Sequence, residues 1–212
     1  MKELVHILFY KFFEILNSRY YFLVDRFYGN KLTDDVKNKV AMNYVSATHS
    51  YSSIIFCFLY FYYPNRYLLH FNKFYSIHYF MYDSQNILVK KYNKLKFLDY
   101  FYLFHHYTAI LILYNIQNSD LHSQFTYMSF FWSEVSNVPY YLIYHLLKTN
   151  GSKERIDKLK KIQKYHYSFI RVFIGGYYAY NFYITGDGKL DLFLGILLYL
   201  SGLFFSYMMF KN

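Results

Sequence analysis

The amino-acid sequence predicts an all-α protein, a multi-pass transmembrane helical bundle or barrel of about seven spans that enclose a polar cavity. Three observations lead to this prediction. Aromatic residues make up 26% of the chain and charged residues only 17%, whereas soluble domains carry about 25% charged residues. Apolar stretches of spanning length recur along the chain. The basic residues gather in short clusters between these stretches.

The composition favours a membrane over a soluble core or a nucleic-acid partner. The 30 Tyr and 24 Phe are more large rings than a core of this size can bury beneath so few charges. Tyr depresses the mean hydropathy, although its ring is apolar and only its tip is polar. The net charge of +10 comes from basic residues that cluster between apolar runs. This arrangement suits loops at an anionic leaflet, so no nucleic acid is expected as a partner. Cys57 is the single cysteine, which rules out an intrachain disulfide.

Each span needs about 20 predominantly apolar residues. The first candidate is interrupted by Glu14, Asn17 and Arg19, and the last is the most apolar, reading LDLFLGILLYLSGLFFSYMMF. Pro64 closes the second span, and Pro139 inside the fifth predicts a kink. In chain order the spans are expected at residues 4–23, 41–63, 70–89, 98–115, 121–146, 161–184 and 190–210.

The connections between these spans predict the topology. Segments 24–40, 90–97 and 147–164 carry four, four and seven basic residues, and they alternate with connections that are poor in Lys and Arg. Cytoplasmic loops carry an excess of Lys and Arg. We therefore expect the C-terminus in the cytoplasm and the N-terminus outside or in a lumen. The sequon at Asn150 would then face the cytoplasm and stay unmodified.

Ionisable residues at membrane depth mark a candidate site, because their burial in hydrocarbon is costly. A helix rises about 1.5 Å per residue, so the depth of each group follows from the expected topology. Five helices bring such groups to one layer in the cytoplasmic half, which predicts a polar cavity between the helices. These groups are His49, Asp83, His105, His106, Glu134 and Arg171.

Local spacing around the paired histidines indicates acid–base chemistry. Asp99, Tyr102 and His106 fall at i, i+3 and i+7 on one helical face, where a carboxylate can fix the tautomer of an imidazole. His105 and Thr108 share a neighbouring face. In such a pair, one histidine can act as base or nucleophile while the other orients it or accepts a proton.

Structural roles remain open for the same residues. A histidine in a membrane also serves as an interhelical hydrogen bonder. Arg171 can form an ion pair with Asp83 or with Glu134, and Asp99 can cap the start of its helix. His49, His105 and His106 are chemically suited to bind a metal, but no HxxxH or CxxC spacing supports such a site, so none is expected.

Four segments resemble the TLC domain family, the membrane domain that includes ceramide synthases. They read SATHSYSS from residue 46, HYFMYDS from 78, FHHYTAIL from 104 and SEVSNVPYYL from 133, and they occur in the family's order. The resemblance divides the chain into an N-terminal anchor span and basic cytoplasmic loop, residues 1–40, and a TLC-like six-span domain, residues 41–212. It implies a barrel of helices around a lipid-sized cavity, in the endoplasmic reticulum.

The resemblance also implies roles for individual residues. His105 and His106 would be the reactive pair and Asp83 a supporting polar residue, with Tyr82 and Asn137 in the cavity wall. Ceramide synthases carry paired aspartates in the following span, where this chain has Glu134, Ser136 and Asn137. The sequence is therefore closer to the branch of the family outside the ceramide synthases.

Two functions are expected from these observations. The first is an acyl-CoA-dependent lipid acyltransferase, with His105 or His106 as base or acyl acceptor. Asp99 or Asp83 would orient it, and Glu134 and Arg171 would hold the polar head of the lipid. The basic loops would attract acyl-CoA, a co-substrate in the absence of any cofactor. The alternative is a non-enzymatic protein that senses lipids, organises the membrane or escorts cargo. A channel or transporter is disfavoured, since the chain shows no inverted repeat.

Overall fold

The computed structural model describes the backbone of residues 2–91, 95–115, 120–185 and 189–211, and this part of the chain is helical throughout apart from short turns. The helices α6, η2 and α7 follow one another without interruption, so the described residues form seven long helical rods. The all-α prediction is confirmed. The elements are α1 (Lys2–Tyr28), the 3-10 turn η1 (Gly29–Lys31), α2 (Asp34–Tyr62), α3 (Arg66–Lys91), α4 (Phe97–Asn115), α5 (Asp120–Lys148), α6 (Lys153–Ser168), the π-helical turn η2 (Phe169–Ile174), α7 (Gly175–Thr185) and α8 (Lys189–Lys211).

Each apolar stretch that the sequence singled out lies within one rod, but two connections are much shorter than predicted. In place of a loop over 24–40, only residues 29–33 join α1 to α2, and helix α6 begins inside the predicted loop 147–164. The Thr33 hydroxyl accepts a hydrogen bond from the Val36 amide at the start of α2. The Ser152 hydroxyl accepts one from the Arg155 amide at the start of α6. These caps let polar residues form the first helical turns. The expected division at residue 40 consequently falls inside α2.

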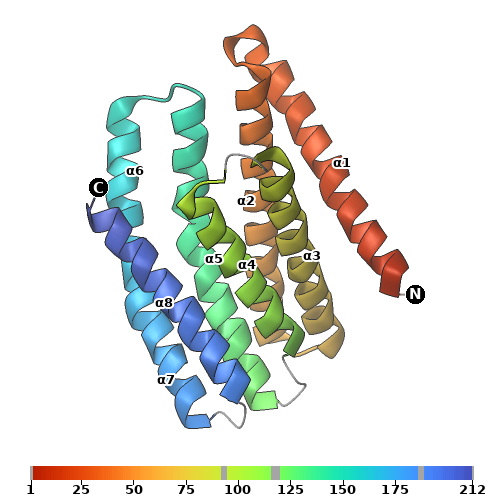
Figure 1. The fold of residues 1–212 in the computed structure, drawn as a ribbon, viewed down its shortest axis with the longest axis vertical. Helices are drawn as coiled ribbons and strands as arrows, with labels where there is room; N and C mark the ends of the chain where they lie inside the picture. The colour runs from red at the N-terminus through yellow and green to blue at the C-terminus, as the bar shows by residue number, and fades with distance from the viewer. Residues whose placement is uncertain (1, 92–94, 116–119, 186–188, 212) are drawn as a thin grey trace.

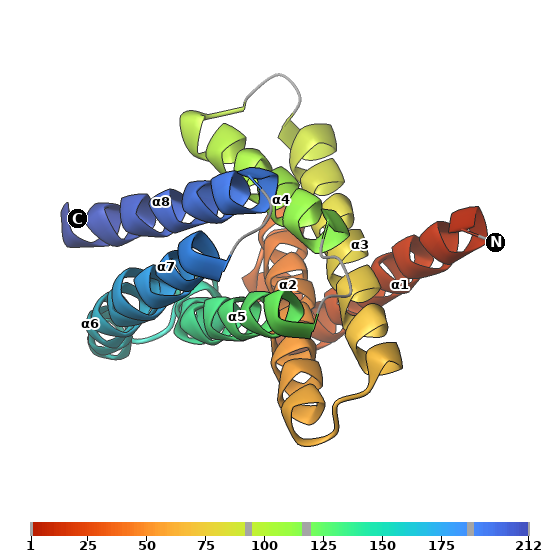
Figure 2. The same ribbon diagram turned by 90° about the horizontal axis from the view of Figure 1, so that it is seen from below.

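The rods form a closed ring. Its order is α2, α3, α4, α8, the α6–η2–α7 rod and α5, with α5 packing against α2 to close it. Figure 2 shows this ring from below, with α1 lying outside it, against α2 and α3. In Figure 1 the α1–α2 turn and the α5–α6 turn lie at the upper end, and the α2–α3 turn lies at the lower end.

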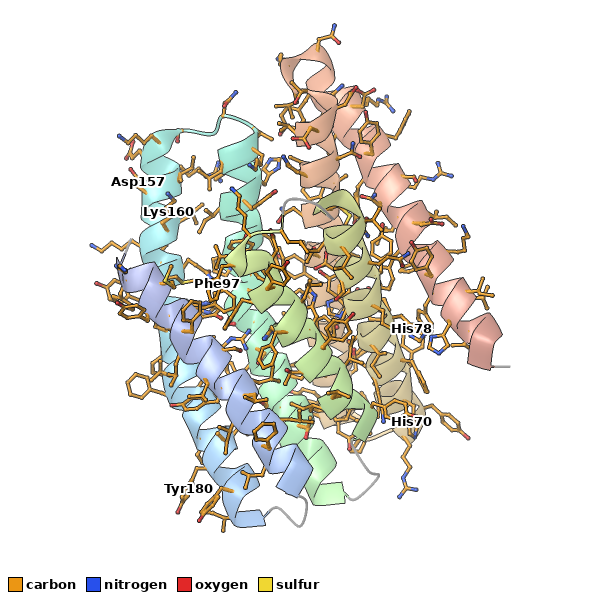
Figure 3. The ribbon with its side chains drawn as sticks, in the orientation of Figure 1. His70, His78, Phe97, Asp157, Lys160 and Tyr180 are labelled. Atoms are coloured by element: carbon orange, nitrogen blue, oxygen red, sulfur yellow. The ribbon has the colours of Figure 1, made fainter. Side chains whose placement is uncertain are left out.

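Aromatic side chains attach α1 to the ring. The fully buried Phe13 ring packs against Tyr75, Tyr79 and Tyr82 of α3, with ring centroids 5.4 to 5.7 Å apart. Nearer the N-terminus, His78 of α3 faces α1, as Figure 3 shows, and its Nε2 lies 2.6 Å from Nδ1 of His6. The α1–α3 contact is therefore packed by rings along its length.

An ion-pair cluster fixes the α1–α2 junction at the upper end. The buried Lys37 amine donates to the carboxylates of Asp25 and Asp34, at 2.6 and 3.2 Å. The hydrogen bond to Asp25 raises the pKa of Lys37, and the hydrogen bond from Lys37 lowers the pKa of Asp34. This cluster ties the end of α1 to the first turn of α2.

Polar and apolar side chains are distributed in an unusual way. Ser50, Ser53, Ser76 and Ser136 are completely buried and His49 is nearly so, whereas many Phe, Leu and Ile side chains lie exposed on the outside of the ring. Within the described residues, one helical segment, Leu192–Lys211, is long and apolar enough to cross a membrane by length and composition. About a fifth of that segment, 22%, is buried inside the protein, and the rest is partly or fully exposed.

Candidate functional site

A cavity of about 900 Å³ lies inside the ring. All six rods of the ring contribute to its wall, and α1 contributes no residue. The groups that the sequence placed in one layer come together here. Eight predicted site residues line the cavity: His49, Asp83, Asp99, His105, His106, Glu134, Asn137 and Arg171.

Two predicted wall residues lie elsewhere. Tyr82 points away from the cavity into the α1–α3 contact, where its ring packs on Phe13 and its hydroxyl points to the Met42 sulfur at 3.9 Å. Thr108 is buried, and its hydroxyl bonds the carbonyl oxygen of Phe104 in its own helix. Both corrections have one cause. Neighbouring residues on a helix point about 100° apart, and Tyr82 and Thr108 lie on the sides of their helices turned away from the cavity, next to the lining residues Asp83 and Ala109.

His106 has a polar neighbour at each of its two ring nitrogens. Its Nε2 lies 3.7 Å from Oδ2 of Asp83, and its Nδ1 lies 3.3 Å from the Ser84 hydroxyl. The Phe80 ring packs beside it, with centroids 5.2 Å apart. The separation from Asp83 is too long for a hydrogen bond but lies within ion-pair range. Asp83 can therefore stabilise the charged imidazolium that forms when Nε2 takes up a proton from a substrate.

His105 and His49 bond serine hydroxyls instead of carboxylates. Nδ1 of His105 lies 3.2 Å from the Ser201 hydroxyl on α8, and the His105 and His106 ring centroids are 6.1 Å apart. The two rings thus belong to different parts of the wall. His49 stacks on Tyr79 with centroids 3.8 Å apart, and its Nε2 meets Ser76 at 3.1 Å.

Asp99 does not orient His106, which corrects one of the two orienting residues proposed from the sequence. Its Oδ2 accepts a hydrogen bond of 2.9 Å from the Lys96 amide, three residues earlier. This is the reciprocal contact of a capping box, because Lys96 immediately precedes α4. The capping alternative is therefore confirmed, while Asp99 also lines the upper part of the cavity.

Arg171 projects from the π-helical turn η2 and bonds neutral oxygens. Its Nε donates to the Ser136 hydroxyl at 3.0 Å, its Nη1 to the Ser133 hydroxyl at 3.0 Å, and its Nη2 to the Ser133 carbonyl at 3.1 Å. The sequence left open an ion pair with Asp83 or Glu134. Among the described residues the guanidinium bonds serine oxygens instead, and Glu134 interacts with it only electrostatically. Glu134 is buried, and its carboxyl group lies within hydrogen-bonding reach of the Ser50 and Asn137 side chains.

Several residues that contact the site's histidines or Arg171, or line the cavity, were not predicted as site residues. Ser133 and Ser136 recur three apart on α5, a helical spacing that could have marked them as acceptors for Arg171. Gln163 was missed because it is uncharged and lies where the predicted loop 147–164 and the predicted span 161–184 overlap; the structure has helix α6 there. Ser84 and Ser201 carry no sequence signal of their own, because only tertiary packing brings their hydroxyls to His106 and His105.

Comparisons with known proteins give no information about the site. No family model, no curated protein and no solved structure matches the chain. Among the described residues, no group of three or more His, Cys, Asp or Glu side chains is arranged to hold a metal ion. The described wall brings together a histidine–carboxylate pair, a second histidine and a guanidinium.

Proposed function

We propose that this chain is an integral membrane protein whose seven rods cross a lipid bilayer. The inverted distribution of side chains supports this. A protein folded in water buries Phe, Leu and Ile and exposes Ser and His, whereas here the ring buries serines and presents apolar side chains on its outside. Hydrocarbon around the ring accommodates that surface, and each helix satisfies its own backbone groups. One described segment is apolar enough by composition to span a membrane, and the many Tyr residues lower the mean hydropathy of the other rods below that of a Leu-rich span.

Exposed tyrosines at the lower end support the same placement. Trp and Tyr gather at the level of the lipid headgroups. Figure 3 shows Tyr180 at the lower end of α7. The basic clusters near the opposite end support a topology in which that end and the C-terminus lie in the cytoplasm. The exposed tyrosines of the lower end are Tyr62, Tyr63, Tyr67, Tyr114, Tyr180 and Tyr183.

Within that frame, the protein acts on a membrane lipid by acyl transfer from acyl-CoA, with His106 as general base. The observation that carries this function is the His106–Asp83 pair in the wall of a large cavity. When Nδ1 carries the ring proton and donates to Ser84, Nε2 presents its lone pair. A lipid hydroxyl or amine gives its proton to Nε2 as it attacks the thioester carbonyl carbon. The carbon–sulfur bond breaks, and the departing CoA sulfur takes the proton from the imidazolium.

A non-enzymatic lipid-binding protein is the second candidate. Its supporting observation is that His105 and His49 both bond serine hydroxyls, as interhelical hydrogen bonders do. In that case the cavity would hold a lipid without changing it, and His106 would serve only to bind. The TLC resemblance fits either function, and it supplies the proposed site of action, the endoplasmic reticulum.

Mass-spectrometric lipid analysis separates the two candidates. Cells express equal levels of the wild type, His106→Ala, His106→Gln and the control His70→Ala, whose histidine lies at the lower end of α3 (Figure 3). Acyl transfer predicts a lipid change with the wild type and His70→Ala that both His106 variants abolish. The same lipid profile with and without the chain rules out acyl transfer and leaves lipid binding.

A further inference from the structure

The wall around Arg171 is built to hold that side chain in place. The aliphatic stem of Arg171 lies against Gly202 of α8, where an added Cβ would come within 3.3 Å of the Arg171 Cβ. The guanidinium carbon lies 5.2 Å from the centre of the Tyr167 ring. The π-helical turn supplies the wider backbone from which Arg171 projects, a feature common at functional sites. Arg171 is therefore fixed by two neighbouring rods, α5 and α8, and by Tyr167 of its own rod.

The positive charge of Arg171 interacts electrostatically with Glu134, which lines the same cavity, but its guanidinium hydrogen bonds go to neutral oxygens. Three of the five N–H groups of a guanidinium are bonded, all of them to neutral oxygens of Ser133 and Ser136. In the part of the chain that the structure describes, no carboxylate lies within 4.0 Å of the guanidinium. A partly buried cation with donors to spare favours an anionic ligand.

Gln163 provides a second and independent observation. Its Nε2 donates to the Ser136 carbonyl at 3.2 Å, which fixes the orientation of the amide. Its Oε1 is buried and has no hydrogen-bond partner, although the side chain lines the cavity. An unbonded buried acceptor costs stability, so a ligand that donates a hydrogen bond beside the anion would satisfy it.

The cavity continues below Arg171, where apolar side chains and several uncharged polar ones line it. Trp132, Ile174, Ala179, Gly195 and Leu198 contribute to its wall there. The whole volume of about 900 Å³ is large for a ligand pocket, which usually measures about 300–1,000 Å³. A hydrocarbon chain attached to the anionic group would fill this part.

We propose that Arg171 and Gln163 bind the phosphate-ester headgroup of a single-chain lipid, an inference that rests on the proposed lipid function. The phosphate oxygens accept from the two remaining guanidinium N–H groups, and a headgroup hydroxyl donates to Oε1 of Gln163. The acyl chain extends past Trp132. A fatty acid fits less well, because its carboxylate carries no neighbouring donor for Gln163.

Trp132 gives this proposal a direct test, since it is the single tryptophan of the chain and lines the cavity. The full chain is purified in maltoside detergent, which contains no phosphate, and its fluorescence is followed during titration. The ligands are oleoyl lysophosphatidate, oleoyl monoacylglycerol, oleate and inorganic phosphate. The variants are Arg171→Gln, Gln163→Leu and the control Arg155→Gln, an exposed arginine of α6. Trp132→Phe sets the background.

Lysophosphatidate is expected to bind the wild type and Arg155→Gln about 10- to 100-fold more tightly than monoacylglycerol, the range of a charged hydrogen bond. Arg171→Gln should remove that preference, and Gln163→Leu should weaken lysophosphatidate binding about 3- to 10-fold. The wild-type preference needs no variant, so a misfolded Arg171→Gln leaves the test intact.

Other outcomes overturn the proposal in distinguishable ways. Equal affinities for lysophosphatidate and monoacylglycerol would refute phosphate recognition but would remain consistent with a lipid-binding cavity. Oleate as tight as lysophosphatidate would reassign the wall to carboxylates, and competition by inorganic phosphate at equal affinity would make it a site for free phosphate. If neither amphiphile reaches Trp132, the proposed lipid function fails as well.

Discussion

Replacing Asp83 by Asn tests the central contact of the site. The substitution preserves the shape of the side chain and removes its charge, 3.7 Å from Nε2 of His106. With an effective dielectric constant of about 20, two unit charges at that separation attract by roughly 4 kcal/mol. This attraction exists only while His106 carries the proton, so its loss raises the barrier of the transfer step. Since the Asn dipole recovers part of it, we expect acyl transfer to slow about 100- to 1,000-fold.

The measurement is the rate at which labelled acyl-CoA enters lipid in membranes that contain equal amounts of each variant. Asp157→Asn is the matched control, because Asp157 is exposed on the outer side of α6 (Figure 3). Asp83→Asn should retain the cavity's affinity for lipid, since the carboxylate acts on the imidazolium. An Asp83→Asn rate equal to that of Asp157→Asn, alongside an inactive His106→Ala, would refute the role of the pair.

Three further predictions address the membrane topology, the packing of α1 and the α1–α2 junction. In sealed vesicles with the cytoplasmic face outward, an impermeant maleimide should label Lys153→Cys but not Tyr67→Cys. The native Cys57 is buried and should give no background. Labelling of Tyr67→Cys alone would indicate the opposite topology. Phe13→Ala should lower the free energy of unfolding by about 3 kcal/mol, because it empties a fully enclosed site. Unfolding in detergent measures this, with the exposed Phe12→Ala as control. Equal unfolding midpoints for the two variants would contradict the packing. The lowered pKa of Asp34 and the raised pKa of Lys37 make the junction stable between their ionisation ranges. Its contribution should be lost as the pH falls through the Asp34 pKa, and again as it rises through the Lys37 pKa. Limited proteolysis at residues 29–33 across pH would show this, and Lys37→Met, which lacks the pair, should respond less at both extremes.

The helical content and the meeting of ionisable groups were predictable because both depend on short-range periodicity. Long apolar stretches define helices wherever they pack. Counting residues from each helix end gave the heights of His49, Asp83, His106, Glu134 and Arg171, and all five line one cavity. Height along a rod follows from the constant rise of the helix, so it needs no knowledge of the neighbouring rods.

The partner of each group was not predictable in the same way. Asp99 shares a helical face with His106, yet it caps α4, and Asp83 from another rod takes the place beside the ring. Arg171 bonds serines of α5 where the sequence offered carboxylates. Such choices depend on the rotation of one rod against another, which the side-chain pattern of a single segment does not specify.

The sequence by itself determined that the chain is helical and which side chains lie at a common depth, because rise and periodicity are properties of each helix alone. The closed ring, the contact between α2 and α5, and the outward turn of Tyr82 were decided by tertiary structure. They arise from packing between segments far apart in the chain, where about 100° of rotation exchanges a cavity residue for its neighbour.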